Sequence, residues 1–273
     1  MRLKAIIFDW AGTVVDFGSL CPVSAFQAAF LEKGIAVTPE EIQQFMGIHK
    51  REHILAILAL PPVRLQWQAV HGREPTPADV NGLYRIAESR ILATVAGSAT
   101  PTRGLDEALA FARQTGLRIG STTGYTAPLM ERLAPAAAQQ GYAPEFWVAS
   151  DQVPHGRPWP WMIFKNMEHL KIYPPSAIVK VGDTVADVAE ANNAGVWAVA
   201  VAESSSLVGK SESDLAALST RERQRLIRMA ARKLALAGAH FVIENLSELA
   251  ATLEQIEYRL ERAQMPPQLL AGQ

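Results

Sequence analysis

The chain has 273 residues, 49% of them hydrophobic, so it is long and apolar enough to bury a substantial core. Its 26 basic and 27 acidic residues nearly cancel, which argues against nucleic acid or an anionic membrane as the partner. Cys21 is the only cysteine, which excludes an internal disulfide and a cysteine-rich zinc site. We find no signal peptide and no apolar run of membrane-spanning length, and we therefore expect a cytoplasmic protein that acts on a small molecule.

Short apolar runs separated by helical or mixed segments predict an α/β fold with a parallel sheet. The predicted strands cover residues 3–8, 117–122, 177–181 and 196–201. In open sheets of this kind ligands bind beyond the carboxyl ends of the strands, where Asp9, Thr123 and Asp183 fall. We therefore expect these three side chains to meet at one site.

Residues 19–98 have helical periodicity and no convincing buried strand, which predicts an inserted helical domain. Residues 1–18 and 99–273 then form the α/β core domain. Within the insert, Thr38 and Thr76 each precede a proline and an acidic residue, a pattern typical of helix starts. Residues 50–60 between them predict a further helix.

Two later segments of the chain carry weaker signals. Residues 204–213 are polar enough to predict a mobile loop. Residues 219–262 predict mostly helix, interrupted by a strand-like run at residues 240–243.

The segment Asp9-Trp10-Ala11-Gly12-Thr13 places a carboxylate at the end of a buried strand, before a turn with small residues. An ionised aspartate there can attack phosphorus, and the turn can bind phosphate or a metal through its backbone. By itself the segment is equally consistent with an aspartate that caps a turn.

Together with three later segments in the expected order, this motif resembles the haloacid dehalogenase superfamily. The later segments are residues 119–124, 156–160 and 181–187. The resemblance implies that Thr123 binds the transferring phosphoryl group and that Arg157 stands in place of the superfamily's lysine as a fixed positive charge. It also implies a magnesium ion, held by the carboxylates of Asp9 and Asp183 and by the backbone carbonyl of Ala11.

Asp187 lies four residues after Asp183, and two roles stay open for it, as a ligand of the metal or as the group that orients a metal-bound water. The cation is needed because Asp9 and a dianionic substrate repel each other.

Most phosphatases of this superfamily carry a second aspartate two residues after the nucleophile, where this chain has Ala11. The segment Met46-Gly47-Ile48-His49-Lys50-Arg51-Glu52-His53 resembles the cap of the phosphonoacetaldehyde hydrolase family, in which a lysine forms a Schiff base with the substrate aldehyde. This likeness extends from residue 3 to about residue 201. It implies cleavage of a carbon–phosphorus bond, with Lys50 as the electron sink.

The resemblance also suggests roles for residues near Lys50. We expect burial to depress the pKa of Lys50, because the amine must be neutral to attack an aldehyde. His53 falls on the same helical face and is a candidate to shuttle protons, and Met46 is a candidate to pack against the lysine stem. Gly124 and Tyr125 are assigned to substrate binding, although Tyr125 is equally consistent with an ordinary loop aromatic.

Two alternative functions remain at this point. The chain can be a capped phosphatase or phosphomutase that acts on a phosphate ester, or a non-catalytic binding protein that keeps the phosphoacceptor fold. The group that activates the water for dephosphorylation is unassigned, because Ala11 cannot act as a base. We also expect a homodimer through the helical insert, since the family resemblance implies one and since Leu55, Ile57 and Trp67 need to be covered.

Overall fold

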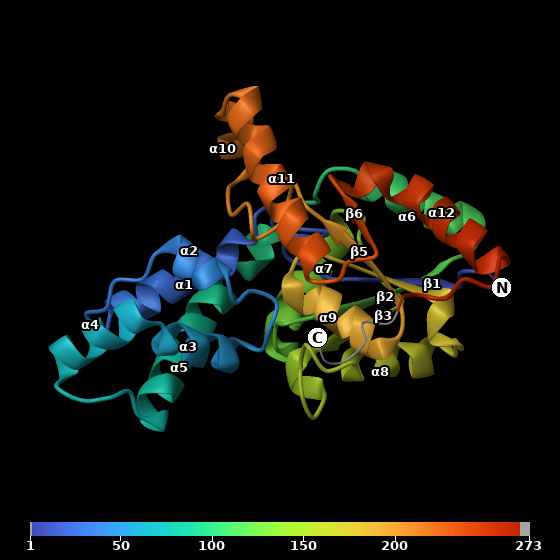
Figure 1. Cartoon of the computed structure of the whole chain (residues 1–273). Helices are drawn as coiled ribbons and strands as arrows, with labels where there is room; N and C mark the ends of the chain where they lie inside the picture. The colour runs from blue at the N-terminus through green and yellow to red at the C-terminus, as the bar shows by residue number, and fades with distance from the viewer. Residues whose placement is uncertain (1, 268–273) are drawn as a thin grey trace.

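The computed structural model describes residues 2–267 and contains one six-stranded sheet in which every neighbouring pair of strands is parallel (Figure 1). The strand order is β3-β2-β1-β4-β5-β6. The strands are β1 (Ala5–Phe8), β2 (Arg118–Thr123), β3 (Phe146–Ala149), β4 (Ile178–Gly182), β5 (Trp197–Val201) and β6 (Phe241–Ile243). The predicted α/β fold with a parallel sheet is confirmed.

Side-chain alternation along the central strands explains the layered core. Ile6 and Phe8 of β1 pack on one face, in the cluster that contains α6 (Leu105–Thr115), α7 (Ala127–Gln139) and α12 (Leu249–Glu261). Ala5 and Ile7 face the other cluster, with α8 (Trp161–Leu170), α9 (Val185–Ala194) and α11 (Thr220–Leu236). Because both faces are covered, β1 and β5 read as continuous apolar runs in the sequence.

Five helices between β1 and β2 gather beside the sheet as a separate lobe with its own apolar cluster (Figure 1). They are α1 (Leu20–Leu31), α2 (Pro39–Gln43), α3 (Lys50–Ala59), α4 (Pro61–His71) and α5 (Pro77–Thr94). Thr38 and Thr76 form the capping boxes that the sequence indicated. The domain limits at residues 19 and 98 stay a prediction.

Two residues that we expected to need a covering partner are already covered. Ile57 and Trp67 are fully buried inside the helical lobe, so this part of the expectation was wrong. Leu55 is 43% exposed, as expected of a residue on the outer face. The helices of the lobe pack on one another through Ile57 and Trp67. Sequence periodicity predicts that such positions are buried, but it does not tell whether a neighbouring helix or a second protein chain covers them.

The two chain connections to the helical lobe are bonded to each other next to β1. The amide of Thr102 donates to the carbonyl of Val14 over 3.0 Å, and the Thr102 hydroxyl donates to the carbonyl of Thr13 over 2.5 Å. Val15 also forms a β-bridge with Pro101. The chain therefore leaves and re-enters the sheet domain at one point.

The segment expected to be a mobile loop begins inside the protein. Ser204, Ser205 and Ser206 are each at most 2% exposed and contact the ends of β1 and β4. Ser211 then caps the short helix α10 (Glu212–Ala217), which begins outside this buried run. The prediction was wrong for the serine run, because polarity alone does not separate solvated hydroxyls from internally bonded ones.

No helix within residues 2–267 has the length and apolar character that crossing a membrane requires.

Candidate active site

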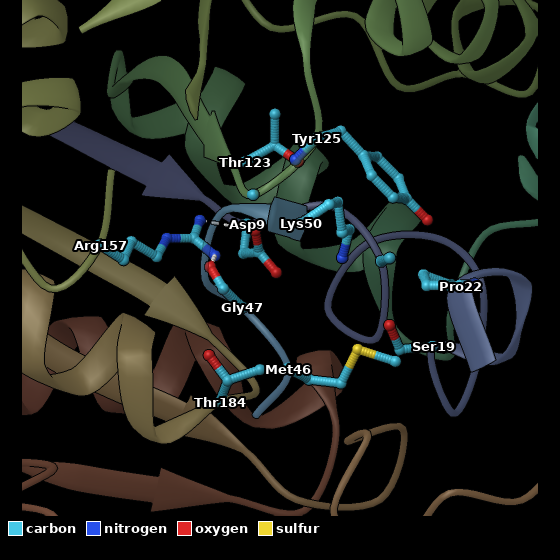
Figure 2. A pocket seen from close by; sticks show the side chains of 12 residues that line it. Asp9, Ser19, Pro22, Met46, Gly47, Lys50, Thr123, Tyr125, Arg157 and Thr184 are labelled. Atoms are coloured by element: carbon cyan, nitrogen blue, oxygen red, sulfur yellow. Dashed lines mark hydrogen bonds and ion pairs between the residues drawn. The ribbon is translucent and has the colours of Figure 1, made fainter. Parts of the chain in front are cut away.

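Asp9 follows β1 directly, and its carboxylate is held by Arg157 at the carboxyl edge of the sheet (Figure 2). Arg157 Nη2 lies 2.6 Å from Asp9 Oδ1, and Asp9 is only 4% exposed. Burial raises the pKa of Asp9, and the positive charge of Arg157 acts in the opposite direction. The ion pair with Arg157 therefore holds the Asp9 carboxylate in place at the pocket beyond the strand ends.

Arg157 is held in place by other buried polar groups besides Asp9. Its Nε lies 2.9 Å from Glu190 Oε2, and its Nη2 lies 3.1 Å from Asp187 Oδ1 and donates to Thr122 Oγ1 over 2.8 Å. Burial opposes its charge, but the carboxylates of Asp187, Asp9 and Glu190 outweigh burial and raise the pKa of Arg157. The guanidinium is therefore a permanent cation in a fixed orientation.

Two charged members of this network, Lys180 and Glu190, were not predicted from the sequence. Lys180 Nζ lies 2.9 Å from Asp187 Oδ1 and 3.8 Å from Glu190 Oε2, and both Lys180 and Glu190 are almost completely buried. A lysine inside the apolar run of β4 was a signal that could have revealed the first. Glu190 lies three residues after Asp187 on α9, on the same helical face, which could have revealed the second.

The three aspartates predicted to hold a metal lie together. Asp9, Asp183 and Asp187 each offer an oxygen within 4.8 Å of the others, and all three are buried. Asp183 follows β4, and Asp187 is the acidic member of the capping box that Thr184 forms at the start of α9. Ala11 lines a pocket together with Asp9.

The charges of this cluster fit a divalent cation. Within residues 2–267, Asp9 and Asp187 have basic partners, whereas Asp183 makes no ion pair within 4 Å. Burial raises the pKa of Asp183, and the neighbouring charges of Asp9 and Asp187 raise it further. Hard oxygen ligands and an uncompensated buried carboxylate are what a magnesium ion would satisfy.

Lys50 begins α3, and the helical lobe carries it into the same pocket as Asp9 (Figure 2). Lys50 is 6% exposed, and its Nζ lies 5.1 Å from the ring centre of Tyr125 and 5.9 Å from that of Phe26. Burial lowers the pKa of Lys50 to about 8, although the charge of Asp9 opposes this shift. The amine is thus partly neutral at a pH near 7.

The pocket between the two lobes is small, with a free volume of about 20 Å³, roughly the space of one water molecule. Its lining residues from the sheet domain are Asp9, Ala11, Thr123, Gly124, Tyr125, Arg157 and Thr184. Its lining residues from the connection and the helical lobe are Ser19, Pro22, Met46, Gly47 and Lys50. Ser19 and Pro22 were not predicted, because nothing in the sequence around them signals chemistry.

Glycines allow the helical lobe to approach the sheet domain closely. A side-chain carbon on Gly124 would lie 2.9 Å from the carbonyl oxygen of Gly47 and 3.0 Å from that of Ile48. Gly47 has a φ of +93°, and a side-chain carbon there would lie 2.4 Å from Thr184 Oγ1. Arg157 Nη1 also donates to the carbonyl of Gly47 over 3.3 Å. These contacts hold the two lobes in a closed arrangement.

His53 lies behind Lys50, inside the helical lobe, and does not line the pocket. Its Nε2 lies 2.7 Å from the carbonyl oxygen of Ile42, and its ring packs 4.6 Å from that of Phe26, centre to centre. Burial lowers the pKa of His53 to about 3, and the charge of Lys50 lowers it further. The ring is therefore neutral, with the proton on Nε2, because a carbonyl oxygen can only accept.

A family model described as haloacid dehalogenase-like hydrolase matches residues 3–195, which include β1, the helical lobe and most of the charged network. The fold and the clustered carboxylates therefore define a hydrolase of this superfamily. A crystal structure of β-phosphoglucomutase from Clostridium difficile shares the fold, with a TM-score of 0.65 at 13% identity, over 96% of this chain and 100% of that one.

More similar relatives narrow the assignment. A phosphonoacetaldehyde hydrolase from Nitratidesulfovibrio vulgaris is 42% identical over 97% of this chain and 94% of its own length. One from Bacillus thuringiensis is 40% identical over 94% and 97%. A crystal structure of a phosphonoacetaldehyde hydrolase-like protein from Oleispira antarctica has a TM-score of 0.95 at 34% identity, over 97% of this chain and 96% of that one. The chain belongs to the phosphonoacetaldehyde hydrolase family.

Proposed function

We propose that this enzyme hydrolyses the carbon–phosphorus bond of phosphonoacetaldehyde to acetaldehyde and phosphate. The observation that carries the proposal is that a buried amine and a buried aspartate line the same small pocket. A phosphate ester could use this lysine only as a cation, whereas a substrate with an aldehyde at one end and a phosphonate at the other needs a neutral amine as well as the aspartate. The names of the relatives agree with this substrate.

Lys50 would make the carbon end of the substrate a leaving group. Its neutral amine adds to the aldehyde carbon, and uptake of one proton with loss of water gives an iminium. When the carbon–phosphorus bond breaks, its electron pair moves into the iminium and forms an enamine, which avoids a free carbanion. Protonation of the enamine carbon and hydrolysis by water then release acetaldehyde and regenerate Lys50.

Asp9 would receive the phosphoryl group. Its carboxylate oxygen attacks phosphorus as the enamine departs, and water later cleaves the aspartyl phosphate. Arg157 faces the negative charge of the phosphoryl oxygens, and it is pre-oriented by Glu190, so little reorganisation is needed at the transition state. The lack of an acid at Ala11 is consistent with this chemistry, because the leaving group is a carbon atom.

The acidic cluster would hold magnesium, with Asp9, Asp183 and the carbonyl of Ala11 as ligands and Asp187 as a ligand or a holder of bound water. The ion supplies positive charge that lets a carboxylate approach a phosphonate dianion. Thr184 and Lys180 hold Asp187 in place through contacts of 2.5 Å and 2.9 Å.

Four of the remaining predicted site residues line the pocket, whereas His53 does not. Thr123, Gly124, Tyr125 and Met46 line the pocket, and we propose that they contact the substrate. His53 does not line it, and its pKa near 3 disfavours the protonated ring. We therefore limit its proposed role to the neutral ring, with Nδ1 as the atom free to accept a hydrogen bond.

The lobes must separate for the substrate to enter, since the closed pocket has room for about one water molecule. Closure then brings Lys50 to Asp9 and shields the aspartyl phosphate from bulk water. Opening to release the products is a candidate for the slow step.

We also propose that the protein forms a homodimer through the helical lobe. With Ile57 and Trp67 buried internally, the support rests on apolar residues that remain exposed there, with Leu65 66%, Val70 53% and Leu55 43% exposed. Sedimentation of the purified chain and of a Leu65→Glu variant tests this, and an unchanged dimer in the variant would place the interface elsewhere.

Borohydride trapping tests the proposed function. With phosphonoacetaldehyde present, reduction should leave a stable adduct on Lys50, located by peptide mass spectrometry. A phosphatase or a non-catalytic binding protein would give no adduct. Phosphate release from phosphonoacetaldehyde should also exceed release from common phosphate esters, and the reverse order would favour the phosphatase.

A further inference from the structure

The serine segment, residues 204–206, lies between β5 and α10 and has no part in the proposed chemistry. All three serines are at most 2% exposed, in a place where a loop would ordinarily be solvated. Burying hydroxyl groups is unfavourable unless each finds a partner. Ser204 and Ser205 find such partners through their hydroxyl groups, whereas Ser206 bonds through its backbone amide and its hydroxyl has no hydrogen-bond partner within residues 2–267.

Two of the three serines bond to one metal-binding residue. The backbone amide of Ser206 donates to Asp183 Oδ2 over 2.9 Å, and the Ser205 hydroxyl donates to the backbone carbonyl of Asp183 over 2.7 Å. Thr13 Oγ1 donates to the other carboxylate oxygen over 3.2 Å. Within residues 2–267 no basic side chain reaches Asp183 within 4 Å, so neutral donors alone set its orientation.

The bond from Ser205 also bears on the second carboxylate. The carbonyl that it holds is linked directly to the backbone amide of Thr184, the residue that caps α9 and accepts from the amide of Asp187 over 3.1 Å. Fixing this peptide group therefore fixes the start of the helix that carries Asp187.

Ser204 holds the turn on the opposite side of the cluster. Its hydroxyl donates to the carbonyl of Gly12 over 2.7 Å. Gly12 has a φ of +85°, and a side-chain carbon there would lie 2.5 Å from Asp183 Oδ2. The turn after Asp9 therefore lies in close contact with the carboxylate of Asp183, and the serine segment forms hydrogen bonds with both.

We propose that Ser204, Ser205 and Ser206 are positioning residues that set the geometry of the metal site. Asp183 and the turn at Gly12 belong to different strands, and the serine segment joins them through neutral hydrogen bonds. Donors behind a metal-binding carboxylate orient it, and their loss typically lowers metal affinity about 10-fold or more. This inference rests on the proposed function only through the proposed magnesium site.

The test separates positioning from ordinary structural support. The full-length Ser205→Ala variant is compared with the wild type and with Ser213→Ala, a matched control in which an exposed serine of α10 is changed. Thermal unfolding is followed while Mg²⁺ is titrated, since an ion that binds only the folded chain stabilises it by an amount that grows with the logarithm of the ion concentration divided by Kd.

We expect Ser205→Ala to need about 10-fold more Mg²⁺ for the same stabilisation, and Ser213→Ala to match the wild type. A Ser205→Ala protein that is less stable without metal but binds Mg²⁺ as tightly as the wild type would overturn the proposal. If Ser205→Ala does not fold, Ser204→Ala carries the same test through the Gly12 turn, again with weaker Mg²⁺ binding expected and unchanged binding contradicting.

The metal titration and the trapping of Lys50 test the positioning role and the proposed function independently. A wild type that shows no stabilisation by Mg²⁺ would refute the positioning role, since there would be no ion to position. Borohydride trapping would still report on the proposed function in that case, because formation of the imine does not use the acidic cluster.

Discussion

Imine formation at Lys50 should depend on pH with a midpoint near 8. The attacking form is the neutral amine, and burial lowers the pKa of this group to about 8 from an ordinary value of 10.5. At pH 7 the neutral fraction is then roughly 9%, about 300-fold more than an unshifted lysine would supply. The rate should rise steeply between pH 6 and pH 8 and level off above pH 9.

Borohydride trapping measures this directly when the rate of adduct formation with phosphonoacetaldehyde is followed over pH 6 to 10. Lys50→Arg should form no adduct at any pH, and Lys233→Arg, which changes an exposed lysine on α11, should behave as the wild type. A rate that keeps climbing in proportion to hydroxide up to pH 10 would show that Lys50 is not desolvated when it reacts, and the account of the pocket would then be wrong.

Three further outcomes follow from the structure. Removing divalent metal with EDTA should abolish phosphate release but leave trapping of Lys50 intact, and loss of both would contradict separate roles for the two lobes. Lys50→Met should raise the free energy of unfolding at pH 7 by about 1–3 kcal/mol in urea denaturation, because it removes a buried charge, and a less stable variant would argue against that burial cost. Gly124→Ala should lower kcat/KM about 10-fold or more by pushing the lobes apart, while the unfolding midpoint stays within 2 °C; full activity would mean that the contact with Gly47 is not needed for closure.

The central strands and the motifs at their ends could be predicted because their signals are local. A strand buried on both faces reads as an apolar run, and Asp9 and Asp183 come directly after β1 and β4, while Thr123 is the last residue of β2. β3 was missed because its four residues, Phe146–Ala149, form too short a run to separate from a loop. β6 was predicted one residue too long, a normal uncertainty at an element's end.

The charged network beneath Arg157 could not be read in the same way. Lys180 and Glu190 become partners only when β4 and α9 pack together, and a sequence pattern does not give the distance between them. The same limit applies to the buried serines, whose partners lie more than 20 residues away in the chain. A sequence motif therefore predicts the residues that carry the chemistry, but it does not predict which hydrogen-bond donors from distant segments orient them.

The bond between Thr102 and the carbonyls of Thr13 and Val14 has a consequence for how such enzymes diversify. An insertion whose ends are fastened beside the strand that carries Asp9 can grow, shrink or be exchanged at small entropic cost, about 0.6 kcal/mol for each doubling of length. The strand that carries Asp9 need not move when this happens. The helical lobe can therefore be changed to admit other substrates while the proposed phosphoryl acceptor stays in place.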